Sequence, residues 1–146
     1  MEPQMDTDEH RLNAISERII GCSYTVANAL GHGFLEKVYE HALAYELRSS
    51  GLALETHKAL QVRYRDIVVG EYVADLLVEG LVPVELKAIK EFENVHLAQC
   101  INYLKATGLP LCLPINFGTP KIRMKRMVSP SYPCSSVSIC GFNDPC

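Results

Sequence analysis

The sequence predicts an α/β domain in which a mixed central β-sheet is flanked by helices, in the order α-α-β-β-β-α-β-β. Two observations predict this fold. Apolar residues recur every three or four positions over residues 8–49, every second position over residues 60–89, and every three or four again over residues 95–107. The chain of 146 residues is also 48% hydrophobic, which is enough to bury a core without disulfides or a structural metal. Helices and strands in this order pack as layers on a sheet.

Two helices are expected first. A single apolar face indicates a helix over about residues 8–30, and its members are Leu12, Ile15, Ile19, Cys22, Val26 and Leu30. Gly31 and Gly33 come after this face and are suited to end the helix. A second helix is expected from about Leu35 to Ser49, closed by Gly51.

Three strands are then expected to form an antiparallel meander. They cover Leu60–Tyr64, Val68–Val78 and Leu81–Ile89, with turns at Arg65-Asp66 and Glu79-Gly80. The meander is the part of the chain where the apolar period of two is clearest, so it is expected to supply the centre of the sheet.

One helix and two strands complete the predicted domain. The helix covers Val95–Thr107, and the strands cover Leu111–Phe117 and Lys121–Val128. Pro114 interrupts the first of these strands, and proline cannot donate a ladder hydrogen bond, so we expect an edge position, a bulge or a local distortion there. Residues 129–146 are rich in Ser, Pro and Cys and are expected to be a poorly ordered tail, which leaves residues 1–128 as the folded domain.

Composition excludes several classes of protein. No apolar run approaches the ~20 residues of a membrane span, and the N-terminus is acidic and polar, unlike a secretory signal, so a cytoplasmic protein without membrane contact is expected. The net charge is −3, and residues 8–128 hold 14 acidic and 14 basic residues. A polyanion must therefore be bound by a local patch or through a metal. The cysteines of the tail lack the spacing of a zinc site, and Cys22, Cys100 and Cys112 are expected in the core.

Charged residues occur inside the apolar middle strands. Asp75 lies within residues 72–78, and Glu85 and Lys87 lie within residues 82–89, on the same face of their strand. One interpretation is a structural ion pair in which Lys87 neutralises a carboxylate. The other is a metal site, because two carboxylates on adjacent strands, joined by the Leu86 carbonyl, suit a hard cation such as Mg²⁺.

Two helices carry further candidates. Glu36 shares a stripe with Tyr39 and core leucines, and it is either a favourable charge at a helix N-terminus or a third carboxylate facing the site. His96, Gln99 and Tyr103 lie at i, i+3 and i+7 on one helix face. They form either a polar edge or a row that binds substrate and orients metal ligands.

The ordered set of Glu36, Asp75, Glu85-x-Lys87 and Gln99-x-x-x-Tyr103 resembles the PD-(D/E)XK nuclease superfamily, in particular its RecB-like branch. The stretch Gly33-x-x-Glu36-x-x-Tyr39 is similar to the signature of the GxxExxY protein family. Residues 29–36, 103–108 and 115–118 also fit that family, and the resemblance covers about residues 10–128. Ala74 stands where the PD motif has proline, and the tail lies outside the pattern.

The resemblance implies a restriction-endonuclease-like core and a hydrolase that cleaves phosphodiester bonds with Mg²⁺ or Mn²⁺. Asp75 and Glu85 would bind the metal, Glu36 would complete its shell, and Lys87 would assist the attacking water. The residues expected to bind substrate or support the site are Tyr39, His96, Gln99 and Tyr103.

The expected partner is nucleic acid, with DNA preferred, in repair, recombination or defence. Lys121, Arg123 and Lys125 would share a strand face and contact phosphates, although an edge strand made soluble by charge is the alternative. The second hypothesis for the whole chain is a nuclease-like fold without catalysis that binds nucleic acid or protein. A protein partner and the oligomeric state stay open at this point.

Overall fold

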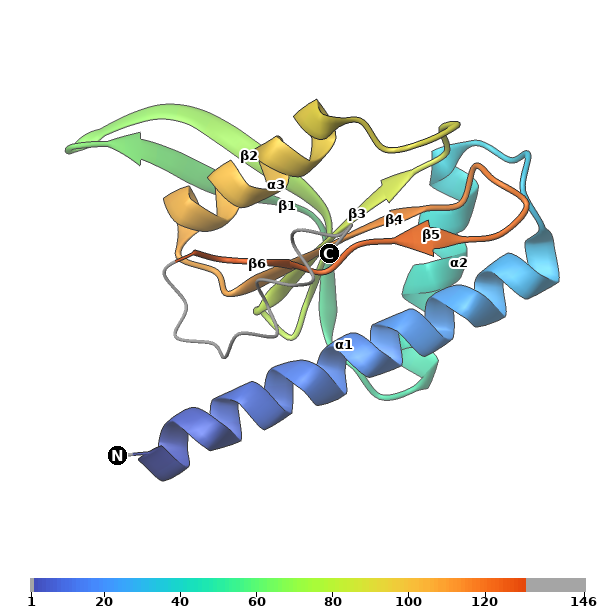
Figure 1. Cartoon of the computed structure of the whole chain (residues 1–146), viewed down its shortest axis with the longest axis horizontal. Coiled ribbons are helices and arrows are strands. Elements are labelled where there is room, and N and C mark those ends of the chain that lie inside the picture. Colours follow the sequence, from blue (N-terminus) through green and yellow to red (C-terminus); the bar gives the residue numbers. More distant parts are fainter. Residues whose placement is uncertain (1, 131–146) are drawn as a thin grey trace.

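The computed structural model describes residues 2–130, with side chains from residue 9 onward, and Figure 1 shows its elements. The expectations for the tail beyond residue 130, including Cys134, Cys140 and Cys146, lie outside the described residues. The helices are α1 (Glu2–Leu30), α2 (Glu36–Ser49) and α3 (Asn94–Thr107). The strands are β1 (Leu54–Tyr64), β2 (Ile67–Val78), β3 (Val82–Lys87), β4 (Leu111–Asn116), β5 (Arg123–Met124) and β6 (Met127–Val128).

The six strands form one mixed sheet in the order β1-β2-β3-β4-β5, with β6 also paired to β4. β1, β2 and β3 are the predicted antiparallel meander, and β3 pairs in parallel with β4, where Val84 lies opposite Leu113. The parallel pairing requires a crossover between the two strands, and α3 is that crossover. The predicted fold class, a mixed sheet flanked by helices, is confirmed.

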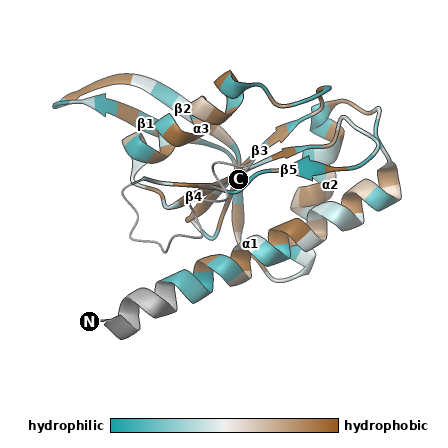
Figure 2. Ribbon diagram, viewed as in Figure 1, coloured by the Kyte–Doolittle hydropathy of each residue, from teal (hydrophilic) through white to brown (hydrophobic). Residues whose placement is uncertain are grey.

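The helices cover opposite faces of the sheet. The larger core joins apolar side chains of α1 and α2 to Leu76, Val84, Leu86 and Leu113. The smaller core joins Cys100 and Leu104 of α3 to Cys112 and Met127. Figure 2 shows the central strands mostly in the hydrophobic colour and α1 alternating between both colours, as expected for a buried sheet and an amphipathic helix. No helix among the described residues has the length and hydropathy needed to cross a bilayer.

The β1–β2 hairpin extends beyond the body of the molecule as a two-stranded arm (Figure 1). Its first strand begins at Leu54, six residues before the predicted start. Residues 54–59 include Glu, Thr, His and Lys, so their apolar period is too weak to identify a strand. The pairing with β2 orders them instead.

The predicted last strand, Lys121–Val128, is divided into β5 and β6, and Pro114 explains the division. The Lys125 N–H donates to the Pro114 carbonyl at 3.1 Å. In a strand the N–H and C=O of one residue point to the same side. Pro114 has no N–H, so it cannot donate a second hydrogen bond to the segment that its carbonyl contacts. The distortion expected at Pro114 is therefore found in the neighbouring segment, at the break between β5 and β6. Pro114 itself is buried within β4.

Candidate active site

The site begins where β2 and β3 separate. Their pairing ends at Leu76 and Val84, after which β2 continues beside β1 and β3 beside β4. The carboxylate of Asp75 takes the place of the missing strand contact and accepts the Leu86 N–H at 2.8 Å. The Leu86 carbonyl points to the same edge of β3 as its N–H, because the neighbouring Lys87 carbonyl bonds to the Phe117 N–H on the β4 side. The opening therefore gathers carboxylate and carbonyl oxygens.

Both predicted carboxylates are in an unfavourable environment for charge. The pKa of Glu85 is raised to about 7, mainly by burial and also by the Asp75 charge, while the Tyr72 hydrogen bond and Lys87 lower it. Burial also raises the pKa of Asp75, while the Leu86 N–H and Lys87 lower it. The ion pairs within 4 Å among the described residues all lie elsewhere, so Lys87 does not neutralise either carboxylate by direct contact.

A small pocket on the α3 side of the sheet brings Glu85 and Lys87 together with the predicted row on α3, while Asp75 and Glu36 do not line it. Its polar lining residues are Tyr72, Glu85, Lys87, His96, Gln99 and Tyr103. Cys100 and Pro114 complete the wall. The row of side chains on α3 thus lines one pocket with Glu85 and Lys87, with His96 and Tyr103 half-buried and Gln99 exposed.

Tyr72 is a site residue that sequence reasoning missed. Its ring stacks on Tyr103 with centroids 3.9 Å apart and planes at 12°, and its hydroxyl donates to the Glu85 carboxylate. Burial raises the pKa of Tyr72, followed by the charges of Cys112 and Glu85, so the hydroxyl keeps its proton and acts as a donor. The stack connects β2, β3 and α3 and fixes the position of the Glu85 carboxylate.

Replacing Tyr72 with phenylalanine is expected to raise the pKa of Glu85 above about 7, because the lost hydrogen bond is one of the influences that lowers it. The carboxyl ¹³C resonance of Glu85, followed by NMR against pH without added metal, measures this pKa. Tyr103→Phe is the matched control, since it preserves the stacked rings and the Tyr72 hydroxyl. Equal titration midpoints for the wild type and Tyr72→Phe would contradict the assigned hydrogen bond.

His96 has a structural partner within α3. The Glu93 N–H donates to His96 Nδ1 at 3.0 Å, as part of a capping box at the start of the helix. When Nδ1 accepts a hydrogen bond, the proton of the neutral imidazole resides on Nε2. His96 therefore lines the pocket as a ring whose orientation is fixed by the cap.

The three positions of the predicted Gly33, Glu36 and Tyr39 pattern have different partners. Tyr39 is fully buried, donates its hydroxyl to the Gly31 carbonyl at 2.6 Å and stacks on Phe117, so it holds the loop before α2 and does not line the pocket. Gly33 has a φ of 114°, which L side chains rarely adopt. Glu36 accepts the Ala88 N–H at 3.2 Å, directly after Lys87. The pattern attaches α2 to the end of β3.

Asn116 is a second residue that sequence reasoning missed. It is fully buried, accepts the N–H groups of Ile89 at 3.0 Å and Gly118 at 2.9 Å, and donates to the Ile89 carbonyl at 2.9 Å. Ala88 and Ile89 therefore bond to side chains, which is why β3 ends at Lys87 and not at the predicted Ile89. An Asn inside an apolar segment is the only sequence signal that indicated this contact.

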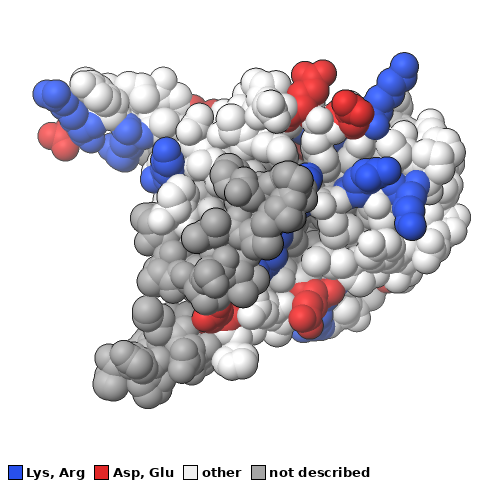
Figure 3. All heavy atoms as spheres, viewed as in Figure 1, with Lys and Arg blue, Asp and Glu red and all other residues white. Residues whose placement is uncertain are grey.

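The predicted basic residues are spread over an interrupted strand. Lys121 and Arg123 are exposed, while Lys125 is half-buried at the break between β5 and β6. Figure 3 shows Lys and Arg side chains over β5 and the loop before it. Because the strand is broken between Met124 and Met127, the expectation of one continuous basic face over residues 121–125 is not met.

The oxygen atoms at the opening between β2 and β3 suit a hard cation that takes few of its ligands from the protein. The described residues contain no group of three or more His, Cys, Asp or Glu side chains able to hold a metal ion. Glu36 instead bonds to Ala88, and the nearby Glu40 bonds to His57 at 2.5 Å. Asp75, Glu85 and the Leu86 carbonyl remain, and one or two carboxylates are the usual protein ligands of Mg²⁺, which keeps several waters.

Comparison with known proteins identifies the family. The sequence model of the PD-(D/E)XK nuclease superfamily matches residues 13–127, which include most of α1, every element from α2 to β5 and the first residue of β6. Searches of curated proteins and of solved structures returned no match. Because the match covers most of the chain and the mixed sheet flanked by helices is consistent with it, the chain belongs to the PD-(D/E)XK nuclease superfamily.

Proposed function

We propose that this chain is a metal-dependent nuclease that hydrolyses phosphodiester bonds of DNA. The observation that carries the proposal is the pair of carboxylates at the opening between β2 and β3. Both have raised pKa values, and Lys87 is close enough to lower both values without forming a contact ion pair. Uncompensated buried charge lowers the stability of a fold, so a site of this kind is typical of function.

Asp75, Glu85 and the Leu86 carbonyl are the proposed ligands of Mg²⁺ or Mn²⁺, with Glu36 at the margin of the shell. A divalent cation at this position would make water more acidic and offset negative charge on the phosphoryl oxygens. Lys87 orients the attacking water and stabilises charge that develops at phosphorus. Its position follows from β3, whose end is bonded to Glu36 and Asn116.

The residues of α3 support this site. Tyr103 holds Tyr72 against Glu85, and Gln99 and His96 face the same pocket, where they are proposed to contact the substrate. Lys121 and Arg123 are exposed and Lys125 is half-buried, and we assign them to phosphates outside the pocket. Such contacts give affinity without sequence readout.

We also place the chain in the GxxExxY family, within the RecB-like branch. The support is the attachment of the Gly33–Tyr39 segment to the end of β3 and the position of Gln99 and Tyr103 beside Glu85. We propose residues 1–128 as the catalytic domain of a cytoplasmic protein that acts in DNA repair, recombination or defence.

The proposal predicts that purified protein cleaves DNA only when Mg²⁺ or Mn²⁺ is added. Asp75→Asn and Lys87→Met are expected to lower the cleavage rate by a factor of about 10³ or more, because each removes a group that acts on the reacting phosphate. Linear and circular substrates, both single- and double-stranded, should be followed by gel electrophoresis. The comparison of linear with circular DNA separates exonuclease from endonuclease action.

A second readout does not depend on turnover. Millimolar Mn²⁺ is expected to raise the melting temperature of the wild type more than that of Asp75→Asn, because ligand binding stabilises the native state. The increase should be larger at pH 8 than at pH 6, since protons compete for Glu85 below its pKa of about 7. An unchanged melting curve together with intact DNA would contradict the proposal and favour a binding module without catalysis.

A further inference from the structure

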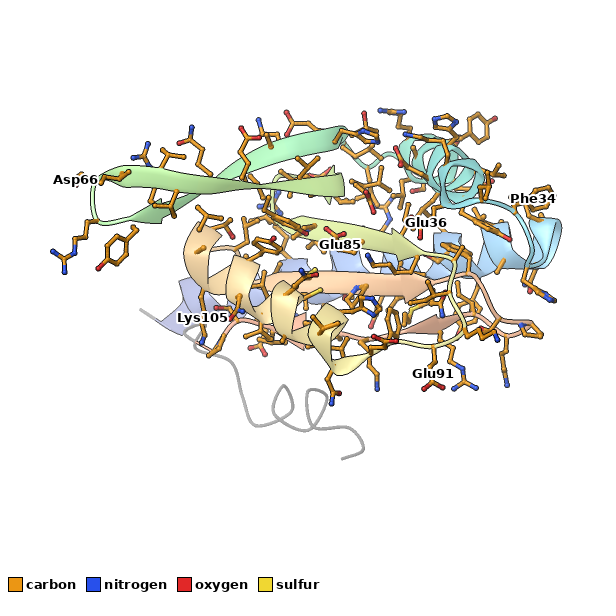
Figure 4. All side chains as sticks on the ribbon, turned by 90° about the horizontal axis from the view of Figure 1, so that it is seen from above. Phe34, Glu36, Asp66, Glu85, Glu91 and Lys105 are labelled. Carbon is orange, nitrogen blue, oxygen red and sulfur yellow. The ribbon has the colours of Figure 1, made fainter. Side chains whose placement is uncertain are left out.

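A second cleft lies directly beside the proposed catalytic residues. Its walls are the loop between α1 and α2, the chain after β3 and the chain after β4, represented by Phe34, Leu35, Glu36, Ala88 and Gly118. Glu36 of α2 and Ala88 meet just beyond the end of β3, where the Ala88 N–H bonds to Glu36 one residue after Lys87. Figure 4 shows Glu36 between Glu85 and Phe34. The cleft therefore adjoins the end of β3, while Asp75, Glu85 and Lys87 are not among its lining residues.

Phe34 and Leu35 are apolar side chains that the fold leaves accessible in this cleft. Phe34 is 46% exposed and Leu35 is 80% exposed, although both stand next to a buried core. The Phe34 ring meets the Tyr39 ring edge to face, with centroids 6.1 Å apart and planes at 74°, so at most one face of the Phe34 ring is in contact with Tyr39. A free aromatic face is the surface on which a nucleobase stacks.

The loop that carries Phe34 is held in place before any ligand binds. The Phe34 N–H donates to the Tyr39 hydroxyl at 3.2 Å, and that hydroxyl donates to the Gly31 carbonyl at 2.6 Å. Tyr39 is itself fixed by stacking on Phe117 at 4.6 Å. A pre-ordered aromatic side chain loses little conformational entropy on binding, which favours recognition.

Two exposed lysines lie close in sequence to the residues that line the cleft, whose own wall contains the acidic Glu36. Lys37 is exposed immediately after Glu36, and Lys121 is exposed three residues after Gly118. Cations at these positions suit the phosphates on either side of a base that stacks on Phe34. The wall residue Ala88 directly follows Lys87 in the chain, so this end of the cleft lies nearest the proposed catalytic residues.

We propose that Phe34 is the stacking platform for an unpaired nucleobase next to the scissile phosphate, with Leu35 as an apolar wedge that separates this base from its neighbour. This inference rests on the proposed nuclease function and specifies its substrate as DNA with at least one unpaired base, in the form of a single strand, a frayed end or a flap. A fully paired duplex cannot present a base to the cleft without unstacking it.

The test uses a series of single-stranded DNAs of about twelve nucleotides, each with 2-aminopurine at a different position. They are bound to the Asp75→Asn protein so that the strand stays intact. Stacking on Phe34 is expected to change 2-aminopurine fluorescence at one position. Phe34→Ala is expected to abolish that change and to weaken binding, measured by fluorescence anisotropy, at least about fivefold. Phe34→Trp should retain both signals, because it keeps an aromatic face.

Tyr45→Ala is the matched control, since Tyr45 is 69% exposed on α2 but outside the cleft, and its affinity should equal that of the parent. Melting curves of all variants exclude unfolding as the cause of any loss.

If the wild type cleaves DNA and Phe34→Ala binds and fluoresces as its parent does, the base site is refuted while the nuclease stands. If Phe34→Ala loses affinity and the wild type cleaves nothing, the base site stands and the catalytic proposal is refuted. Unchanged DNA affinity with a lower sedimentation coefficient would assign Phe34 to a protein contact and refute the base site.

Discussion

Exchange of Glu85 for glutamine is expected to abolish DNA cleavage and, at the same time, to stabilise the protein at pH 8 in EDTA. Burial moves the pKa of Glu85 from 4.5 to about 7, a difference of about 3 kcal/mol in favour of the protonated form. The folded protein therefore binds more protons than the unfolded chain between these values, and its stability falls as the pH rises from 4.5 to 7. Glutamine removes the charge but still accepts the Tyr72 hydrogen bond.

Melting curves of both proteins from pH 4 to pH 8 measure this effect. The difference in melting temperature should be near zero at pH 4, where the carboxyl group is protonated in both states. At pH 8 the variant should melt several degrees higher, given about 2–4 °C for each kcal/mol in a chain of this size. Glu55→Gln is the control, because Glu55 is exposed and pairs only with Lys58. A variant that melts below the wild type at pH 8 would identify Glu85 as a structural charge.

The fold could be predicted from the sequence where the apolar period was strong. The meander, the helix over residues 95–107 and the strand at residues 111–117 all follow from local patterns and correspond to β2, β3, α3 and β4. The start of β1 and the division into β5 and β6 could not be predicted. The first depends on pairing with the far end of β2, where Leu54 lies opposite Val78, and the second on the N–H that Pro114 lacks opposite Lys125.

Some residues of the candidate site could likewise be predicted from the sequence, and others could not. Charged side chains are unusual inside apolar strands, which made it possible to identify Asp75, Glu85 and Lys87. The helical spacing made it possible to identify the row on α3. Tyr72 and Asn116 were not identified, since no local pattern identifies their partners, which lie 13 and 27 positions away in the chain. The strand register and the crossover by α3, which no local pattern encodes, bring these partners together.

The hydrogen bonds made by the two residues after β3 fix the backbone next to Lys87. Glu36 bonds to Ala88 from the α2 side, and Asn116 bonds to Ile89 from the β4 side, so the two residues after Lys87 are held from both directions. The role proposed for Lys87 requires accurate placement, and a side chain at a strand end is mobile unless the backbone is fixed. These contacts supply the fixed backbone.

Substitution of Gly118 by alanine is expected to cause the largest loss of stability of any single-methyl change in this region. A Cβ at Gly118 would lie 2.4 Å from the Ile89 nitrogen, 2.5 Å from the Ile89 oxygen and 2.6 Å from the Ala88 carbonyl carbon. These are backbone atoms and cannot rotate away as a side chain can. The residue cannot move either, because its own N–H bonds to Asn116 at 2.9 Å.

Overpacking of a rigid site costs about 3 kcal/mol, so Gly118→Ala should melt about 10 °C below the wild type. Gly21→Ala is the matched control, because no atom lies within 4 Å of a Cβ at this helical position, and alanine there should stabilise α1 by about 0.5–1 kcal/mol. The displaced Ala88 and Ile89 would also move Lys87, so the fraction of Gly118→Ala that stays folded should cleave DNA more slowly than folded Gly21→Ala. A Gly118→Ala protein with wild-type melting temperature and rate would show that the chain after β3 is free to shift, and that Lys87 is positioned by some other part of the fold.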